Sequence, residues 1–79
     1  MPAEDDLLAV VRLLVDDPRA VSVKKVPGDG EWLLEVDVAP DDRGKVIGRR
    51  GRTIESLRSL AAAREPEDGR SYEVELLDD

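Results

Sequence analysis

The sequence of 79 residues contains no cysteine and no histidine. The chain therefore has no disulfide, no thiolate or imidazole metal ligand and no histidine for acid–base catalysis. Small secreted domains usually need disulfides, so their absence favours a cytoplasmic protein. The longest apolar run, Leu7–Val11, is far too short to span a membrane, and the acidic residues before it are the reverse of a secretory signal. We expect no metal site, no cofactor and no membrane contact.

Residues 1–79 are predicted to form one domain, because the length suits a single core and no linker, repeat or low-complexity tract divides the chain. A domain of this size buries only about 60% of the surface of its unfolded chain, so its stability is marginal. A partner or a dimer interface would therefore be no surprise.

The spacing of apolar residues predicts the order helix–strand–strand–helix–helix–strand. A helical stripe covers 3–15 and stops at Asp16-Asp17-Pro18. Strict alternation predicts strands at 21–25, 32–38 and 72–76, of which the first two form a hairpin across a turn at 27–30. Further helices are predicted from Ala39 to Ile47 and over 52–63, with a polar loop at 64–69. The two-helix connection makes the last two strands parallel, and this gives an α+β fold.

Two positions carry specific expectations. Trp32 alternates with Leu34 and Val36 on the apolar face of its strand, so we expect it in the core, with base stacking as the alternative. Gly44 lies inside the short helix, where glycine costs about 1 kcal/mol relative to alanine. We expect close packing to require this glycine.

The charge is unevenly distributed. The net charge is −7, yet residues 43–64 carry seven basic groups against one acid, and the other 57 residues carry five basic and eighteen acidic groups. A local field matters more than the total, because charges are screened over about 8 Å at physiological salt. Phosphate would be attracted to this segment and repelled elsewhere.

The basic segment contains the turn Gly48-Arg49-Arg50-Gly51 between two amphipathic stretches. The two glycines permit left-handed backbone angles, and the arginines between them must face solvent. The following helix begins at Arg52, and the free N–H groups of its first turn attract anions. A loop of this kind suits a phosphodiester backbone.

The string Val46-Ile47-Gly48-Arg49-Arg50-Gly51 resembles the V-I-G-x-x-G signature of KH domains, whose loop clamps about four nucleotides of a single strand. The longer string from Asp42 to Thr53, with Ala39-Pro40 before it, is similar to the small bacterial single-KH proteins called KhpA. The resemblance covers nearly the whole chain. It implies a type II KH domain of order αββααβ, a three-stranded mixed sheet with helices packed on one face.

The resemblance also implies an RNA-binding site. Backbone amides around the loop, with Arg49 and Arg50, would bind phosphates. Three apolar side chains would form a floor for unpaired bases or belong to the core, and three basic side chains would flank the RNA or remain solvated. The implied site residues are Lys45, Val46, Ile47, Gly48, Arg49, Arg50, Gly51, Arg52, Ile54 and Arg58. The protein would act as a non-catalytic adaptor or RNA chaperone.

The alternative is a protein-interaction module in which RNA binding is weak or incidental. The resemblance implies a possible homodimer, or a heterodimer with a larger KhpB-like KH protein. An enzyme is not expected. Gly44-Lys45 is followed by valine and lacks the glycine of a P-loop five residues before it, and no carboxylate or lysine lies in an apolar segment that would perturb its pKa.

Overall fold

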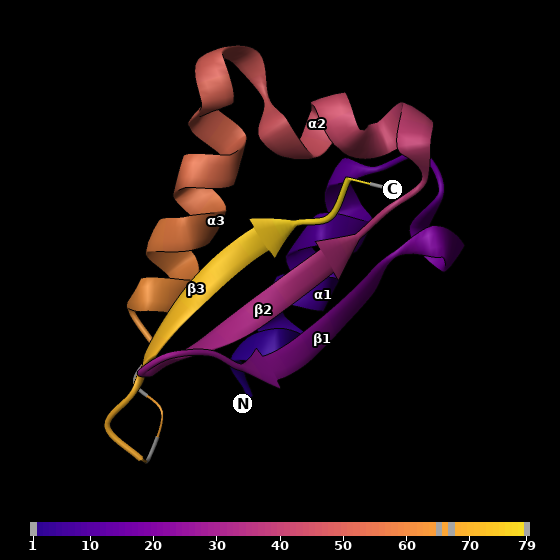
Figure 1. The fold of residues 1–79 in the computed structure, drawn as a ribbon. Coiled ribbons are helices and arrows are strands. Elements are labelled where there is room, and N and C mark those ends of the chain that lie inside the picture. The colour runs from indigo at the N-terminus through magenta and orange to yellow at the C-terminus, as the bar shows by residue number, and fades with distance from the viewer. Residues whose placement is uncertain (1, 65, 67, 79) are drawn as a thin grey trace.

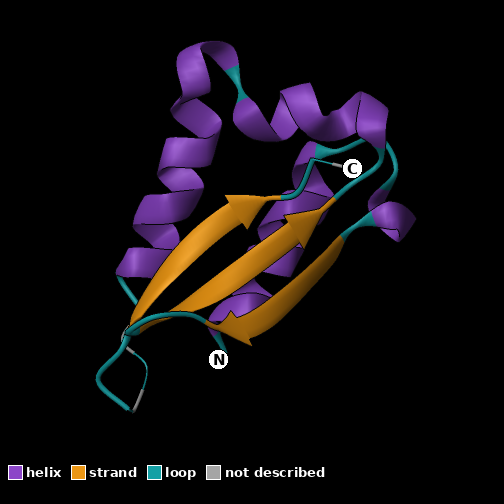
Figure 2. Ribbon diagram, viewed as in Figure 1, coloured by secondary structure: helices purple, strands orange, loops and turns teal. Residues whose placement is uncertain are grey.

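A computed structural model describes residues 2–64, 66 and 68–78 (Figure 1). Short 3₁₀ turns precede β1, α2 and α3, at Pro18–Ala20, Pro40–Asp42 and Arg49–Gly51. The helices and strands are α1 (Ala3–Leu14), β1 (Ser22–Pro27), β2 (Glu31–Asp37), α2 (Arg43–Ile47), α3 (Arg52–Ala62) and β3 (Ser71–Leu76). The predicted order αββααβ is confirmed (Figure 2).

The three strands form one mixed sheet in the order β1-β2-β3. β1 and β2 pair antiparallel, with Val23 opposite Val36, whereas β2 and β3 pair parallel, with Leu34 opposite Val74. In Figure 1, α1 lies behind β1 and β2, and α3 runs beside β3. The predicted sheet, and the helices on one of its faces, are confirmed.

The core lies between this sheet face and the helices. The completely or almost completely buried side chains come from every layer: Leu7 and Val11 of α1, Leu34 and Val36 of β2, and Val46 of α2. The other buried core residues are Ala3, Val21, Val38, Ile54, Leu57, Ala61 and Val74. The apolar spacing predicted these inward faces because each element buries one side only.

Several boundaries differ from the prediction, most of them by one residue. The predicted helix from Ala39 to Ile47 is divided into the 3₁₀ turn Pro40–Asp42 and α2. β1 continues to Pro27, because the ladder with β2 extends through Val26 opposite Leu33. The turn is correspondingly shorter and is closed by a hydrogen bond of 2.8 Å from the Gly28 N–H to the Glu31 carbonyl. The 3₁₀ turn after α1 was not predicted. Glu65 and Glu67 of the predicted polar loop lie outside the described residues.

The prediction that Trp32 belongs to the core is wrong. Trp32 lies on the inner face of the sheet, but it is the second residue of β2, and at this start of the strand it is only half-buried. Its indole N–H donates a 2.9 Å hydrogen bond to Asp68, and the cations of Lys25 and Arg70 lie 4.5 and 4.7 Å from the ring centre. The N–H of Arg70, together with this indole bond, lowers the pKa of Asp68. Trp32 is thus part of a polar cluster at one end of the sheet.

Candidate nucleic-acid interface

The turn between α2 and α3 has a left-handed backbone over much of its length. Gly48 has φ 77° and ψ 171°, Arg50 has φ 59° and ψ 24°, and Gly51 has φ 73° and ψ 14°. A hydrogen bond of 3.1 Å from the Gly51 N–H to the Gly48 carbonyl closes the turn. The turn projects where α2 meets α3, at the top of Figure 1. Its two arginines, Arg49 and Arg50, are exposed.

Gly48 is required here for two reasons. Its backbone angles are almost confined to glycine. In addition, a Cβ at this position would lie 2.6 Å from the Cβ of Thr53 and 2.9 Å from its backbone nitrogen, both closer than atoms can pack. Gly51 needs glycine only for its positive φ, since a Cβ there would make an ordinary contact of 3.9 Å with Ile54.

Gly44 does not have the role that we predicted for it. No heavy atom of the described residues lies within 4 Å of a Cβ built on Gly44, and its φ is not positive. Close packing inside the chain therefore does not require this glycine. Gly44 instead leaves the exposed side of α2 without a side chain, one turn before Gly48.

Replacing these two glycines should change stability in opposite directions. Gly44→Ala is expected to raise the free energy of unfolding by about 0.5–1 kcal/mol, because alanine is the better helix former and has room. Gly48→Ala should lower it by about 1–3 kcal/mol from backbone strain alone. Urea titrations of both variants measure this. A stability loss for Gly44→Ala would show that the helix position is not open.

The basic side chains of 43–64 divide into paired and unpaired groups. Four have carboxylate partners: Arg43 with Asp78, Lys45 with Asp16 and Asp42, Arg58 with Glu55, and Arg64 with Asp6. Among the residues described, no carboxylate pairs with Arg49, Arg50 or Arg52. Within 43–64, the cations without a carboxylate partner among the described residues therefore lie at the turn and at the first residue of α3.

The start of α3 adds to this positive field. Its N-cap residue is Gly51, which has no side chain to accept hydrogen bonds from the first-turn amides. Uncapped amides at a helix N-terminus carry partial positive charge and bind anions. Arg52 is exposed beside them. The start of α3 and the three arginines are thus adjacent in the chain, and a helix N-terminus beside cations suits an anion.

The three apolar residues of the predicted site differ in exposure. Val46 is completely buried and Ile54 is 8% exposed, so both belong to the core, which was one of the two roles left open for them. Ile47 is 37% exposed and lies directly before Gly48. Ile47 is therefore the apolar side chain of this set that offers substantial surface beside the turn.

Lys45 and Arg58 are placed differently from Arg49 and Arg50. The ammonium of Lys45 contacts the carboxylate of Asp16 and lies 3.7 Å from that of Asp42. The hydrogen bond to Asp16, with the charges of both carboxylates, raises the pKa of Lys45. Arg58 forms a 2.7 Å ion pair with Glu55, one turn earlier on α3. The sequence did not single out Asp16 or Asp42 as partners of Lys45.

Among residues 2–64, 66 and 68–78, no three acidic side chains are grouped so as to hold a metal ion. No helix in the same part of the chain is long and apolar enough to cross a bilayer. The candidate site is an exposed, arginine-bearing turn that leads into the N-terminus of α3.

Its fold and turn define the chain as a KH domain, and comparison with known proteins agrees. The model of the KhpA/KhpB KH-domain family matches residues 4–76, and the chain belongs to this family. KH domains are a non-catalytic family, so the chain is not an enzyme.

Relatives cover nearly the full length of the chain. It is 42% identical over 76 residues to "RNA-binding protein KhpA" of Treponema pallidum, which covers 95% of each chain. It is 44% identical over 73 residues to the protein of the same name from Leifsonia xyli, covering 92% of this chain and 93% of the relative. The corresponding protein of Chlamydia caviae is 34% identical over 76 residues, with 96% and 97% covered. No solved structure matches.

Proposed function

We propose that this protein binds short single-stranded RNA by clamping its backbone on the Gly48–Gly51 turn. The observation that carries the proposal is the gathering of Arg49, Arg50 and Arg52 at the start of α3, whose N-cap is a glycine. Within residues 43–64, these three cations have no carboxylate partner among the described residues. The relatives from Treponema pallidum and Leifsonia xyli bear the name RNA-binding protein, which supports RNA as the ligand.

The clamp combines backbone and side-chain donors. Other amides of the turn donate to phosphate oxygens, whereas the N–H groups of Gly48, Gly51 and Arg52 bond to carbonyls of the chain and hold the turn in shape. Arg49 and Arg50 add charge, and a guanidinium can hold a phosphate with two parallel hydrogen bonds. Arg52 extends the positive path along the start of α3.

Ile47 supplies the apolar contact for a base next to the clamped phosphates, because it is exposed and adjacent to Gly48. Val46 and Ile54 support this surface from beneath as core residues. Arg58 lies further along α3, and its exposed pair with Glu55 is of the weak surface kind, so a phosphate can replace the carboxylate. Gly44 keeps the adjoining side of α2 open for a close approach.

The protein catalyses no reaction and acts as a cytoplasmic adaptor or RNA chaperone that binds unpaired segments of RNA. The acidic residues outside 43–64 limit the contact with RNA to the basic segment. Residues 43–64 carry a net +6, whereas the rest of the chain carries −13. A long RNA footprint would therefore run onto a repulsive surface.

A role as a protein-interaction module is the second candidate, with a second copy or a larger KhpB-like KH protein as partner. Leu13 of α1 favours it, since its side chain is 86% exposed. The family that matches the chain also includes KhpB. In this case two clamps would be joined in one assembly, and RNA binding would gain from both sites.

Titration of labelled oligonucleotides of four to sixteen nucleotides at several salt concentrations tests the clamp. Contact with two to four phosphates predicts a slope of log affinity against log salt of about −1.5 to −3 for single strands. Affinity should reach a plateau at about four nucleotides for a monomer. A second rise with longer strands indicates a dimer. A preference for duplex RNA, or a slope near zero, would contradict the clamp and leave the interaction module.

A further inference from the structure

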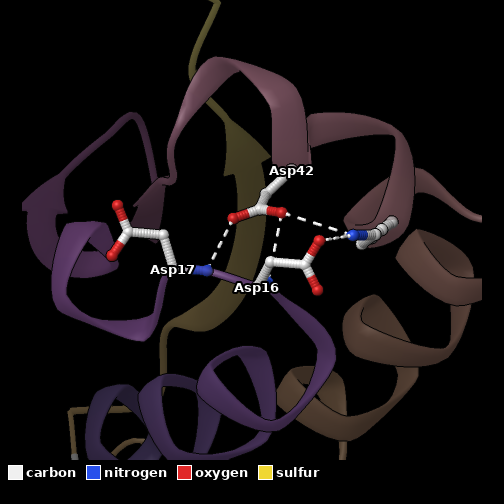
Figure 3. Close-up of polar contacts among 4 residues, drawn as sticks. Asp16, Asp17 and Asp42 are labelled. Atoms are coloured by element: carbon white, nitrogen blue, oxygen red, sulfur yellow. Dashed lines mark hydrogen bonds and ion pairs between the residues drawn. The ribbon is translucent and has the colours of Figure 1, made fainter.

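Asp42 is a buried carboxylate at the start of the segment that carries the turn. It is 3% exposed and stands directly before α2. Its two oxygens accept hydrogen bonds of 3.1 and 3.0 Å from the backbone N–H groups of Asp16 and Asp17 (Figure 3). These bonds connect positions 25 and 26 residues apart in the sequence.

The donors lie where α1 has ended and the chain turns towards β1. α1 ends at Leu14, and Pro18 begins the following 3₁₀ turn. The N–H groups of Asp16 and Asp17 donate to the carboxylate of Asp42, which therefore joins the end of α1 to the start of α2. α2 is only five residues long and leads directly into Gly48. A displacement at Asp42 would therefore be transmitted to the turn over about 8 Å of helix.

Lys45 completes the connection. It lies one turn after Asp42 on α2, and its ammonium is shared between Asp16 and Asp42 (Figure 3). The N–H of Asp16 is the largest cause that lowers the pKa of Asp42; burial opposes it, and the Asp17 N–H and Lys45 lower the pKa further. Asp42 is thus held in its charged form by the groups that it joins.

We propose that Asp42 is a positioning residue for RNA binding: together with Asp16 and Lys45 it holds α2 against the end of α1 and so places the Gly48–Gly51 turn, without touching RNA. Lys45 acts through this contact and not on a phosphate. A phosphate that recruited Lys45 would have to displace two carboxylates, whereas Arg49 and Arg50 have no carboxylate to displace among the described residues. This inference rests on the proposed RNA clamp.

The test compares four variants in RNA titrations over a salt series, at a temperature where each variant is folded. Asp42→Asn keeps the shape but loses the charge and one acceptor, and Lys45→Gln removes the cation. Both should weaken binding about 5- to 30-fold and leave the salt slope as in the wild type. Arg50→Gln should reduce the slope by about 0.7, as the loss of a phosphate contact requires.

Asp41→Asn is the matched control, because Asp41 is the exposed neighbour of Asp42 and the change in charge is the same. It should leave affinity within about twofold, since exposed substitutions have small effects. Amide NMR shifts provide a measurement that needs no RNA: Asp42→Asn should move the signals of Asp16, Asp17, Gly48 and Gly51, and Asp41→Asn should leave those of the two glycines in place.

Three results would overturn the inference: a folded Asp42→Asn variant with wild-type affinity, unmoved glycine amides in that variant, or a Lys45→Gln variant whose slope falls as that of Arg50→Gln does. Lys45 is partly exposed, so its variant decides the question even if Asp42→Asn does not fold. If the wild-type protein itself binds no RNA, the proposed function fails, and the amide shifts alone decide whether Asp42 positions the turn.

Discussion

Replacing Arg49 and Arg50 together by aspartate is expected to abolish RNA binding while the thermal midpoint stays within a few degrees of the wild type. Both side chains are exposed, and neither pairs with a carboxylate in the described chain, so the replacement breaks no ion pair there. Aspartate also tolerates the left-handed angles of position 50. The turn, however, changes from two positive to two negative charges beside the phosphates. Fluorescence anisotropy with a short single-stranded RNA measures the loss.

The control for charge is the pair Arg12→Asp and Arg19→Asp. Both arginines are exposed and lie in α1 and in the following 3₁₀ turn, so the net charge changes by the same amount away from the clamp. This variant should retain most of the affinity at moderate salt, because screening confines each charge to its surroundings. Wild-type affinity in the Arg49/Arg50 variant would show that the turn is not the RNA site.

Leu34→Ala is expected to have the largest effect on stability. Leu34 is completely buried in the central strand, between Lys25 of β1 and Val74 of β3. Truncation of a buried leucine removes its transfer free energy and leaves a cavity, and it costs about 2–5 kcal/mol. For a domain of this size that loss is a large part of the free energy of unfolding. Urea unfolding followed by circular dichroism measures it.

Leu33→Ala is the matched control, since it is the same substitution one residue earlier. Leu33 points to the sheet face opposite the helices and is only half-buried. Its truncation leaves no enclosed cavity and should cost clearly less than that of Leu34. Equal losses at the two positions would mean that β2 does not face the helices as described.

The local sequence pattern was sufficient to predict the order of the helices and strands and the position of the Gly48–Gly51 turn. Leu34 and Val36 alternate with Glu35 and Asp37, and this indicates which side of β2 is buried, because successive side chains of a strand point to opposite faces. Likewise, glycines at 48 and 51 indicate left-handed backbone angles, because other residues rarely adopt them. Both properties depend on residues close together in the sequence.

Trp32 and Gly44 show where local pattern fails. Alternation placed Trp32 on the correct face of the sheet. It could not show that this face is only partly covered at the start of β2. The partner of its indole, Asp68, is 36 residues away. Gly44 is unfavourable in a helix, but whether a neighbour fills its place depends on tertiary packing, which leaves it open.

The sequence alone determined the fold class, the elements and the position of an arginine-bearing turn, because backbone angles and periodicity are local properties of the chain. Only the tertiary structure decided which cations remain without a partner and which carboxylate is buried. Lys45, Arg49 and Arg50 look alike in the sequence, yet Lys45 is bound by Asp16 and Asp42. Asp42 in turn resembles its exposed neighbour Asp41. Ion pairs and burial depend on segments brought together by folding, and no local pattern contains them.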